Sequence, residues 1–237
     1  MDAPEPRSGD TNDFFLITAH EMRTSLSAMK WLFDMLEKGD FGTLTTEQHD
    51  VIKRACDTNE RLIALVNDVM TVIKNDTADV QYIFAPCNLG HMITAAVKDF
   101  ASAASHKHIH LSFSEPVQPI LVSADQARLR VVIDNLIENA IKYGSNETGV
   151  TLSLTSDQTS ATFSVQNSGI GIPQTDQDRI FQKFFRASNT SQHIGTGLGL
   201  YATKQIVERH KGTISFTGTE GVGAIFTITL PTVPHLV

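Results

Sequence analysis

Two long amphipathic segments, separated by a glycine-containing break, constrain the fold of this chain more than any other feature. Apolar residues recur at three- and four-residue spacing between Asp13 and Leu36, which predicts a long helix. The sequence Gly39-Asp40-Phe41-Gly42 interrupts this pattern and predicts a turn at residues 39–44. A second helix is expected beyond the turn. Its apolar face would comprise Leu62, Leu65, Val66, Val69, Met70 and Ile73.

These two segments predict an antiparallel helical hairpin. Thr45 and Gln48 have the spacing of a capping box and mark the start of the second helix. Helices of about thirty residues joined by a short turn lie antiparallel to each other. A single hairpin has nothing to cover its long apolar stripe. We therefore expect a homodimer in which two hairpins form a four-helix bundle.

Residues 87–232 have the mixed pattern of an α/β sandwich. Asn88 can cap a first helix and Gly144 can end a longer one. The expected helices span residues 89–104, 124–143 and 197–210. The expected strands span residues 109–114, 120–122, 150–155, 161–166, 213–217 and 224–230. Strands interspersed with helices favour a sheet with one packed face and one solvated face.

A change of character at residues 75–87 separates the two predicted domains. A polar stretch there leads into a short β-like run, residues 82–85, which ends at Pro86. The expected organisation is a flexible leader, the hairpin, a linker, the α/β domain and a tail. These parts would span residues 1–11, 12–77, 78–86, 87–232 and 233–237 respectively.

The composition excludes several classes of protein. Hydrophobic residues make up 41% and charged residues 19% of the 237 residues, which argues against wholesale disorder. The net charge of −7 argues against binding nucleic acid through broad phosphate neutralisation. Cys56 and Cys87 lie far apart, so neither a disulfide framework nor a thiolate zinc site is expected. Since no apolar run reaches 18 residues and residues 1–10 lack a signal-peptide core, we expect a soluble, cytoplasmic protein.

One predicted helix of the α/β segment carries polar residues suited to phosphate chemistry. Asn135, Asn139 and Lys142 follow one another at i, i+4 and i+7, so they share one helical face. Two amides and an ammonium could hold a hydrated Mg²⁺ and the phosphates that it bridges. A solvated stripe on an amphipathic helix is the alternative interpretation.

Two glycine clusters in the same segment could bind a nucleotide. Gly169 and Gly171 follow a predicted strand, where the backbone could approach a flat ligand closely. Residues 195–200 open a predicted helix, whose free N–H groups would attract phosphate. Neither cluster is followed by an acidic residue in a βαβ unit, so the order does not match a dinucleotide fold.

Five motifs resemble those of sensor histidine kinases, in the order that this family shows. The resemblance covers about residues 13–232 and includes the H box of the dimerisation domain. It implies a HisKA-type phosphoacceptor hairpin followed by an ATP-binding domain of the GHKL (Bergerat) type. The H box separates this family from the other ATPases of the wider fold. The motifs are AHEMRTSL (19–26, H box), NLIENAIKY (135–143, N box), NSGIGI (167–172, G1 box), IFQKFFR (180–186, F box) and GTGLGL (195–200, G2 box).

The resemblance implies ATP-dependent autophosphorylation of His20 and transfer of the phosphoryl group to an Asp of a response-regulator receiver domain. Glu21, next to His20, would take its proton or orient its ring. Thr24, one helical turn further on, would position water for phosphatase activity toward the partner. Arg186 would reach the γ-phosphate, where a guanidinium suits the developing charge. The chain would then be the cytoplasmic part of a larger, membrane-bound sensor.

The resemblance also assigns the residues that would bind ATP and Mg²⁺. Asn139 would ligate Mg²⁺, Tyr143 would line the pocket, and Asn167 would face the adenine. Residues 187–196 would form a mobile lid over the nucleotide. The complete ATP-binding set is Asn135, Asn139, Lys142, Tyr143, Asn167, Gly169, Gly171, Gly195, Thr196, Gly197, Leu198 and Gly199.

Two positions depart from the family pattern. Asn167 replaces the usual Asp of the G1 box, which removes a charge from the expected adenine contact and adds a donor. Ser25 replaces the usual Pro of the H box, so the helix is expected to be straighter after His20. Asn167 motivates an alternative function, a nucleotide-impaired pseudokinase that acts as a dimeric docking scaffold or as a phosphatase of the regulator. A third hypothesis is an ATPase without histidine transfer.

Two further groups of side chains have structural and functional interpretations. His106, His108 and His110 alternate, so on a strand they would share one face and could bind a metal. No carboxylate or thiolate completes that set, and ordinary histidines are the favoured interpretation. The phenylalanines of residues 181–185 are expected to pack in the core and anchor the lid.

Overall fold

The computed structural model describes residues 8–76, 81–191, 193 and 195–233, and the chain divides into two compact units. One unit comprises Met1–Val80 and Ile194–Leu198, and the other comprises Gln81–His193 and Gly199–Val237. The division after Val80 falls within the predicted linker. Residues 1–7 of the predicted leader and 234–237 of the predicted tail lie outside the described residues. Within the described ranges, no helix is both long enough and apolar enough to span a membrane.

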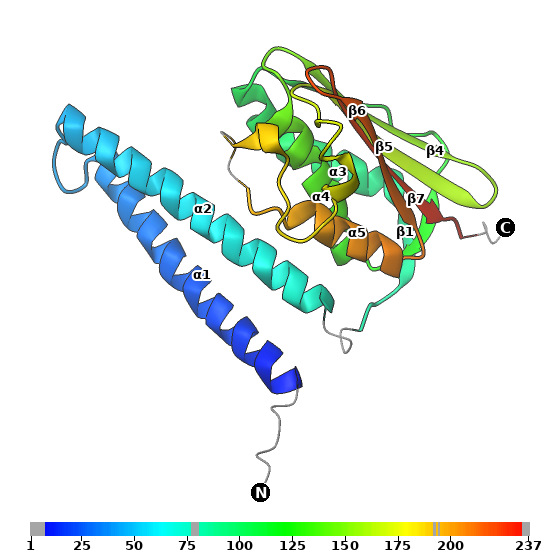
Figure 1. The fold of residues 1–237 in the computed structure, drawn as a ribbon, viewed down its shortest axis with the longest axis horizontal. Coiled ribbons are helices and arrows are strands. Elements are labelled where there is room, and N and C mark those ends of the chain that lie inside the picture. The colour runs from blue at the N-terminus through cyan, green and yellow to red at the C-terminus, as the bar shows by residue number, and fades with distance from the viewer. Residues whose placement is uncertain (1–7, 77–80, 192, 194, 234–237) are drawn as a thin grey trace, which may run out of the picture. The chain divides into compact units, whose positions relative to one another are not determined.

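The first unit contains the predicted helical hairpin (Figure 1). Its helices are α1 (Ser8–Lys38) and α2 (Thr46–Asp76). The capping box is confirmed: the Thr45 N–H donates to Oε1 of Gln48 at 2.9 Å, and the Gln48 N–H donates to Oγ1 of Thr45 at 3.2 Å. These two bonds satisfy backbone donors that the first turn of α2 would otherwise leave unpaired.

Helix α1 begins at Ser8, earlier than the predicted start at Asp13. Both prolines of the leader, Pro4 and Pro6, precede this residue. Gly9 lies in the first turn, where a residue of low helix propensity interrupts no established run of helical hydrogen bonds. The helix continues through Ser25 without interruption, in agreement with the absence of a proline there.

The two helices of the hairpin share a small buried core. Ala19 of α1 packs with Val66 and Met70 of α2, and Leu26 lies against them. Asn59 of α2 is buried, and its Nδ2 donates to the Leu26 carbonyl at 2.9 Å. Large apolar side chains of the hairpin nevertheless remain exposed, as the stripe predicts. They are Met22, Met29, Trp31, Leu32, Phe41, Val51, Leu62 and Leu65.

The second unit is the predicted α/β sandwich, with helices on one side of a five-stranded sheet (Figure 1). The strand order is β2-β4-β5-β7-β6; β2 runs parallel to β4, and the other pairs are antiparallel. The helices are α3 (Leu89–His106), α4 (Gln126–Tyr143) and α5 (Gly199–Arg209). The strands are β2 (His110–Phe113), β4 (Gly149–Ser156), β5 (Ser160–Ser168), β6 (Thr213–Thr219) and β7 (Gly223–Pro231).

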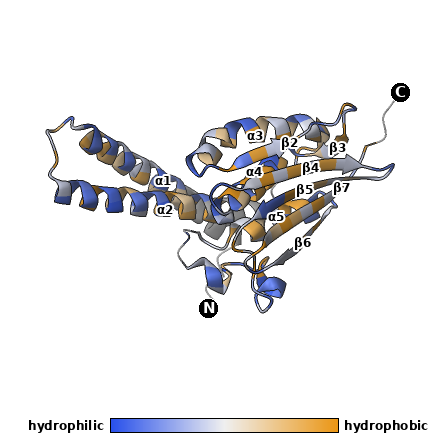
Figure 2. Cartoon of the chain, turned by 90° about the horizontal axis from the view of Figure 1, so that it is seen from above, coloured by the Kyte–Doolittle hydropathy of each residue, from blue (hydrophilic) through white to orange (hydrophobic). Residues whose placement is uncertain are grey.

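Alternating burial along the strands produces the core of this unit. Apolar and polar residues alternate along β4, β5 and β7 in Figure 2. One set of side chains, which includes Phe163 and Ile228, is fully buried. Leu136 of α4 and Ile206 of α5 are also fully buried and belong to the same hydrophobic cluster. The pattern of one packed and one more exposed sheet face is therefore confirmed.

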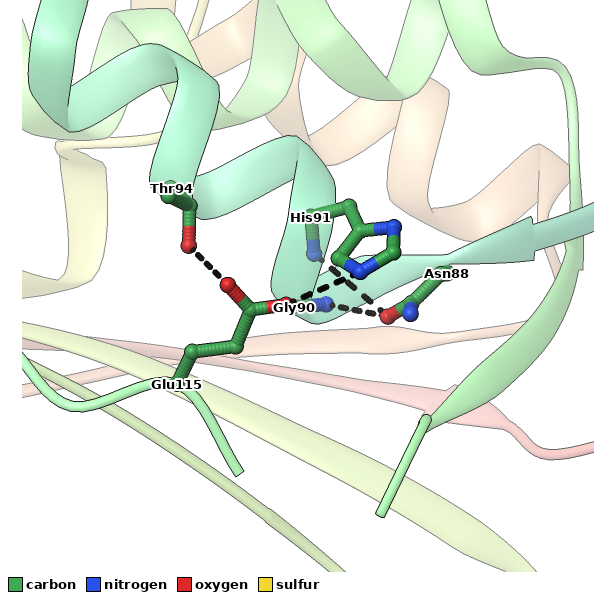
Figure 3. Close-up of polar contacts among 5 residues, drawn as sticks. All are labelled: Asn88, Gly90, His91, Thr94 and Glu115. Atoms are coloured by element: carbon green, nitrogen blue, oxygen red, sulfur yellow. Dashed lines mark hydrogen bonds and ion pairs between the residues drawn. The ribbon is translucent and has the colours of Figure 1, made fainter. Parts of the chain in front are cut away.

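A second, two-stranded sheet corrects one prediction. The structure places β1 at Ala85–Asn88, antiparallel to β3 (Leu121–Ala124), whereas the sequence predicted a run that ended before Pro86. Proline fits within this strand because a two-stranded sheet leaves one edge of β1 without a ladder partner. Asn88 caps α3 as predicted, since its Oδ1 accepts from the N–H groups of Gly90 at 3.0 Å and His91 at 3.4 Å (Figure 3).

Helices α4 and α5 each begin two residues later than predicted. Ala124 still pairs within β3, and Asp125 is the N-cap of α4, where its Oδ1 accepts from the Arg128 N–H at 3.0 Å. Gly197 has a φ of +74°, a left-handed conformation that no helical residue adopts, and α5 starts at Gly199. Gly144 follows the end of α4, as predicted.

The structure contradicts the shared strand face considered for the three histidines and the core position expected for one phenylalanine. His106 ends α3, His108 has a φ of +54°, and only His110 lies on a strand, so the three do not share a strand face. Among the described residues, no group of three or more His, Cys, Asp or Glu could hold a metal ion. Phe184 is 64% exposed and does not pack in the core, because its φ of +62° belongs to a turn. Phe181 and Phe185 do pack against the core.

Candidate nucleotide site

Helix α4 presents the predicted polar face beside the start of α5. Asn135, Asn139 and Lys142 are all half-buried, so they do not form a freely solvated stripe. Nδ2 of Asn135 donates to the Gly199 carbonyl at 3.4 Å and to Oγ1 of Thr203 at 3.5 Å. This contact places the first residue of α5, and the end of the second glycine motif, against the middle of α4.

Asn139 has the properties of a cation ligand. Its side chain is half-buried, and its amide has no hydrogen-bond partner within the part of the chain that the structure describes. An amide oxygen is a hard ligand of the kind that Mg²⁺ accepts, with water and phosphate completing the coordination. The donor set at this position therefore fits the predicted metal.

The first glycine motif lies against the C-terminal end of α4. The Ile170 N–H donates to the Tyr143 carbonyl at 3.2 Å, and Gly144 forms an isolated bridge with Gly169. A Cβ atom at Gly169 would lie 2.0 Å from the Tyr143 carbonyl oxygen, well inside van der Waals contact. At Gly171, with a φ of +59°, a Cβ atom would lie 2.0 Å from the Thr219 carbonyl oxygen. Glycine is thus required at both positions by close backbone approach.

Asn167 lies just before this motif on β5. The residue is only 6% exposed and pairs with Val150 on one side and Ala224 on the other. Its Nδ2 atom is 3.0 Å from the position that a Cβ atom of Gly169 would occupy. Its amide makes no hydrogen bond within the described ranges, so it can bond to a ligand that approaches the glycine.

A cluster of basic and aromatic side chains surrounds the end of α4. The Tyr143 ring lies 5.1 Å from the His193 ring between centroids, and Nζ of Lys142 lies 5.0 Å from the Tyr143 centroid. Arg186 donates to the carbonyls of Thr190, at 2.6 Å, and His193. Lys107 donates through Nζ to the carbonyls of Ile141 at 3.1 Å and Lys142 at 2.9 Å. Lys107 thereby satisfies carbonyls that the end of α4 leaves unpaired.

Hydrogen bonds from the segment after Arg186 hold part of the predicted lid. Oδ2 of Asp176 accepts from the Ser188 N–H at 2.7 Å and from its hydroxyl at 2.8 Å. Nδ2 of Asn189 donates to the carbonyls of Ile170 and Gly171, both at 3.3 Å. Within the predicted lid, residues 192 and 194 lie outside the described residues.

The remaining predicted residues belong to the hairpin unit. Gly195, Thr196, Gly197 and Leu198 are grouped with that unit. Oγ1 of Thr196 accepts from the Leu198 N–H at 3.2 Å. His20 and Glu21 are exposed on α1, and the Thr24 hydroxyl donates to the His20 carbonyl at 3.1 Å.

Known proteins show the same order of domains. Residues 10–78 match the His Kinase A (phospho-acceptor) domain, and residues 124–234 match the histidine kinase-, DNA gyrase B- and HSP90-like ATPase family. The chain belongs to the histidine kinase family. The second match includes α4, α5 and strands β4 to β7 of the sheet, and the first includes His20.

Curated and structural relatives agree with this assignment. The chain is 32% identical over 223 residues to the circadian input-output histidine kinase CikA of Synechococcus elongatus, with 92% of this chain and 30% of that protein covered. It is 30% identical to the sensor histidine kinase WalK of Bacillus subtilis, with 96% of this chain and 38% of that protein covered. The chain thus spans about a third of the length of these relatives. The structure of full-length ShkA in complex with AMPPNP superimposes with a TM-score of 0.73 at 26% identity, covering 95% of this chain and 47% of that one.

Two residues that contact the end of α4, Lys107 and His193, are absent from the predicted set of site residues. Lys107 and His193 lie outside the five family motifs. His193 lies within the predicted lid, residues 187–196, but no role in nucleotide binding was predicted for its side chain. Their position depends on contacts with α4, which begins 19 residues after Lys107 and ends 50 residues before His193. A basic residue after α3 is compatible with capping its own helix, and no signal indicates that it caps α4 instead.

Burial and mutual repulsion shift the pKa values of this cluster. Burial, and then the charge of Lys142, lower the pKa of Lys107. Burial lowers the pKa of His193, and the charges of Lys107, Lys142 and Arg186 lower it further. Burial raises the pKa of Tyr143, which keeps its hydroxyl neutral. The end of α4 is therefore an electropositive region with a neutral histidine, which is an environment that favours an anionic ligand.

Proposed function

We propose that this histidine kinase core transfers the γ-phosphoryl group of ATP to His20 and passes it on to an Asp of a response-regulator receiver domain. The observation that carries the proposal is the junction at the end of α4. The free Asn139 amide, the backbone-packed Gly169 and the Asn135–Gly199 contact belong to one unit there. The names of CikA and WalK, and the AMPPNP bound to ShkA, support the same activity and the same nucleotide.

His20 is the proposed nucleophile. A neutral imidazole nitrogen would form the new N–P bond with its lone pair, while the bond from phosphorus to the ADP oxygen breaks. The ring loses its proton, and the adjacent Glu21 carboxylate is the proposed acceptor or orienting group. Exposure of both side chains on α1 makes them accessible to a nucleotide-loaded domain.

Positioning and charge neutralisation supply most of the catalysis of phosphoryl transfer. Asn139 would hold Mg²⁺, which neutralises charge on the phosphates when it is bound. Lys142 and Arg186 would add positive charge beside the phosphates, and Asn167 would accept a hydrogen bond from the adenine amino group. The phosphates would bind at the N-terminus of α5, which begins at Gly199. The segment just before it, which comprises Gly195, Thr196, Gly197 and Leu198, would also contact them.

Two further parts of the proposal concern partners. The exposed apolar side chains of α1 and α2 support a homodimer through the hairpin, because a single hairpin leaves them in water. Thr24 is the proposed residue that positions water for dephosphorylation of the regulator. Its hydroxyl lies one helical turn from His20 on the exposed side of α1.

Intact mass after incubation with Mg-ATP tests the kinase activity. We expect the gain of one phosphoryl group that is labile in acid and stable in base, as a phosphohistidine is. The His20→Ala variant should show no gain, and His49→Ala, which removes another exposed helical histidine, should gain as the unaltered chain does. No gain at millimolar ATP would contradict the proposal and support the scaffold alternative, while ADP release that is indifferent to His20→Ala would indicate a simple ATPase.

A further inference from the structure

His193 lies in the electropositive cluster with an unsatisfied ring nitrogen. Its Nδ1 atom is buried and has no hydrogen-bond partner among the residues that the structure describes, which do not include residues 192 and 194. A buried polar atom without a partner is costly unless a ligand or water completes it. The Nδ1 atom is therefore available for a hydrogen bond to a ligand that enters the site.

The position of this ring is fixed from several sides. The His193 N–H donates to the Thr190 carbonyl at 3.0 Å, and the His193 carbonyl accepts from Arg186. The imidazole packs on the Tyr143 ring, with centroids 5.1 Å apart and the planes inclined by 50°. Two backbone bonds and one ring contact thus hold Nδ1 in place.

The charges that face His193 indicate what the ligand is. Lys107 follows α3, Lys142 is on α4, and Arg186 precedes the segment that carries His193; all three act on its imidazole. The Glu138 carboxylate acts on Tyr143. Three cations around one buried ring nitrogen favour a polyanion over an uncharged base or sugar.

We propose that His193 is a nucleotide-binding residue whose Nδ1 atom contacts the polyphosphate of ATP. The inference rests on the proposed function, because it assumes that the α/β unit binds ATP. In the free protein the imidazole is neutral, because burial and the three cations lower its pKa. A bound polyphosphate brings negative charge to the same place and favours the protonated ring, which donates a charge-assisted hydrogen bond.

Protonation of His193 on binding determines how the affinity for ATP varies with pH. The pKa of His193 rises on binding, so its contribution to affinity is greatest at low pH and is lost as the pH rises through the pKa of the bound state. Between pH 8 and pH 6, the affinity of the unaltered chain for ATP should increase more than that of a variant without the imidazole. Protonation of ATP itself is common to both proteins and cancels in the comparison.

Calorimetric titration with ATP, ADP and adenosine tests the inference on the full chain. His193→Phe keeps a ring against Tyr143 but removes Nδ1, and His193→Gln is a second variant that keeps a polar group. Loss of a hydrogen bond to a charged group predicts roughly 10- to 100-fold weaker binding of ATP by His193→Phe, and unchanged binding of adenosine. His110→Phe makes the same replacement at an exposed position of β2 and should leave every affinity unchanged.

The outcomes separate this inference from the proposed function. Equal ATP affinity of His193→Phe and the unaltered chain at both pH values would overturn the inference alone. An equal loss for ATP and adenosine would also overturn it, because His193 would then act through packing of the pocket. If the unaltered chain binds no nucleotide, the proposed function fails and this inference fails with it. Weaker ATP binding by His193→Phe, retained adenosine binding and a reduced pH dependence would establish the contact.

Discussion

Asn167 is the residue proposed to contact the adenine of ATP. The residue lies on β5 with 6% of its surface exposed, and its amide has no partner among the described residues. The resemblance to sensor histidine kinases implies an Asp at this position, and therefore that a charge-assisted bond to adenine has been replaced by a neutral one. The amide also avoids the cost of burying a carboxylate when no nucleotide is bound.

Restoring the carboxylate should therefore increase nucleotide affinity. We expect Asn167→Asp to bind ATP roughly 5- to 150-fold more tightly, which corresponds to about 1–3 kcal/mol for a charge-assisted bond. In the absence of nucleotide, the variant should unfold at a lower temperature, because its buried carboxylate lacks a partner. Calorimetric titration and thermal unfolding measure the two effects. Asn146→Asp, at an exposed position, is the control, and unchanged affinity in Asn167→Asp would exclude the proposed adenine contact.

Asp157 illustrates a different residue-level effect, at the turn between β4 and β5. Its Oδ1 accepts from the N–H groups of Thr159 at 2.7 Å and Ser160 at 2.8 Å. These bonds, together with those from both hydroxyls, lower the pKa of Asp157 to about 2. The carboxylate thus stabilises a turn that sets the register of the hairpin.

This shift predicts a pH-dependent contribution to stability. Because the folded-state pKa is below the unfolded value, the stabilisation is complete above about pH 4 and is lost as the pH falls toward 2. The Asp157→Ala variant should unfold at lower urea concentration than the unaltered chain at pH 7, and the two midpoints should converge toward pH 2. A difference that stays constant over this pH range would show that the carboxylate charge is not involved.

At the scale of elements, the site depends on how the end of β5 meets the end of α4. The Ser145 N–H donates to the Ser168 carbonyl at 2.9 Å, and the Ile170 N–H donates to the Tyr143 carbonyl at 3.2 Å. These bonds join the strand that carries Asn167 to the helix that carries Asn139. The strand and the helix therefore hold the expected base contact and the expected metal ligand in one arrangement.

A methyl group added at this junction should push the end of β5 away from the end of α4. In Gly169→Ala, the added Cβ would lie 2.0 Å from the Tyr143 carbonyl oxygen, so backbone must shift. We expect at least a tenfold loss of ATP affinity, and about 1–3 kcal/mol lower stability in urea unfolding, as for other overpacked sites. Gly149→Ala is a matched control, because its nearest neighbour would be 3.8 Å away. Unchanged ATP affinity in Gly169→Ala would show that the junction does not shape the site.

At the scale of the whole molecule, the described part of the hairpin exposes apolar side chains that its small buried cluster does not cover. Among the side chains of the hairpin that the structure describes, the buried cluster consists of Ala19, Val66 and Met70, with Leu26 against them. Leu62 and Leu65 of α2 remain 42% and 39% exposed. Association with a second copy would remove such side chains from water, at about 25 cal/mol for each Å² of apolar area buried.

A charge introduced into this surface should prevent association. We expect the unaltered chain to sediment as a dimer and the Leu65→Glu variant to shift toward a monomer in sedimentation velocity at micromolar concentration. A carboxylate without a partner in a closed interface costs several kcal/mol, which is a 100-fold or larger loss of dimer affinity. Glu47→Gln, on the exposed first turn of α2, should leave the dimer intact. A monomeric unaltered chain would contradict the proposed four-helix bundle.

The sequence by itself determined the hairpin, the capping box and the α/β sandwich. These features depend on local periodicity and on short-range contacts such as that between Thr45 and Gln48, which neighbours in the chain specify. The polar face of α4 was also predictable, because three residues at helical spacing define it. Strand and helix boundaries were less predictable, since Ala124 belongs to β3 only through its pairing with β1.

Only the tertiary structure decided what surrounds the end of α4. Lys107 and His193 belong to no motif, and they reach Lys142 and Tyr143 from distant parts of the chain. The structure also decided that Phe184 is exposed, although its neighbours Phe181 and Phe185 pack in the core. The physical reason is the same in each case. Spacing along a chain specifies which residues share a face, whereas packing between distant segments specifies which faces meet.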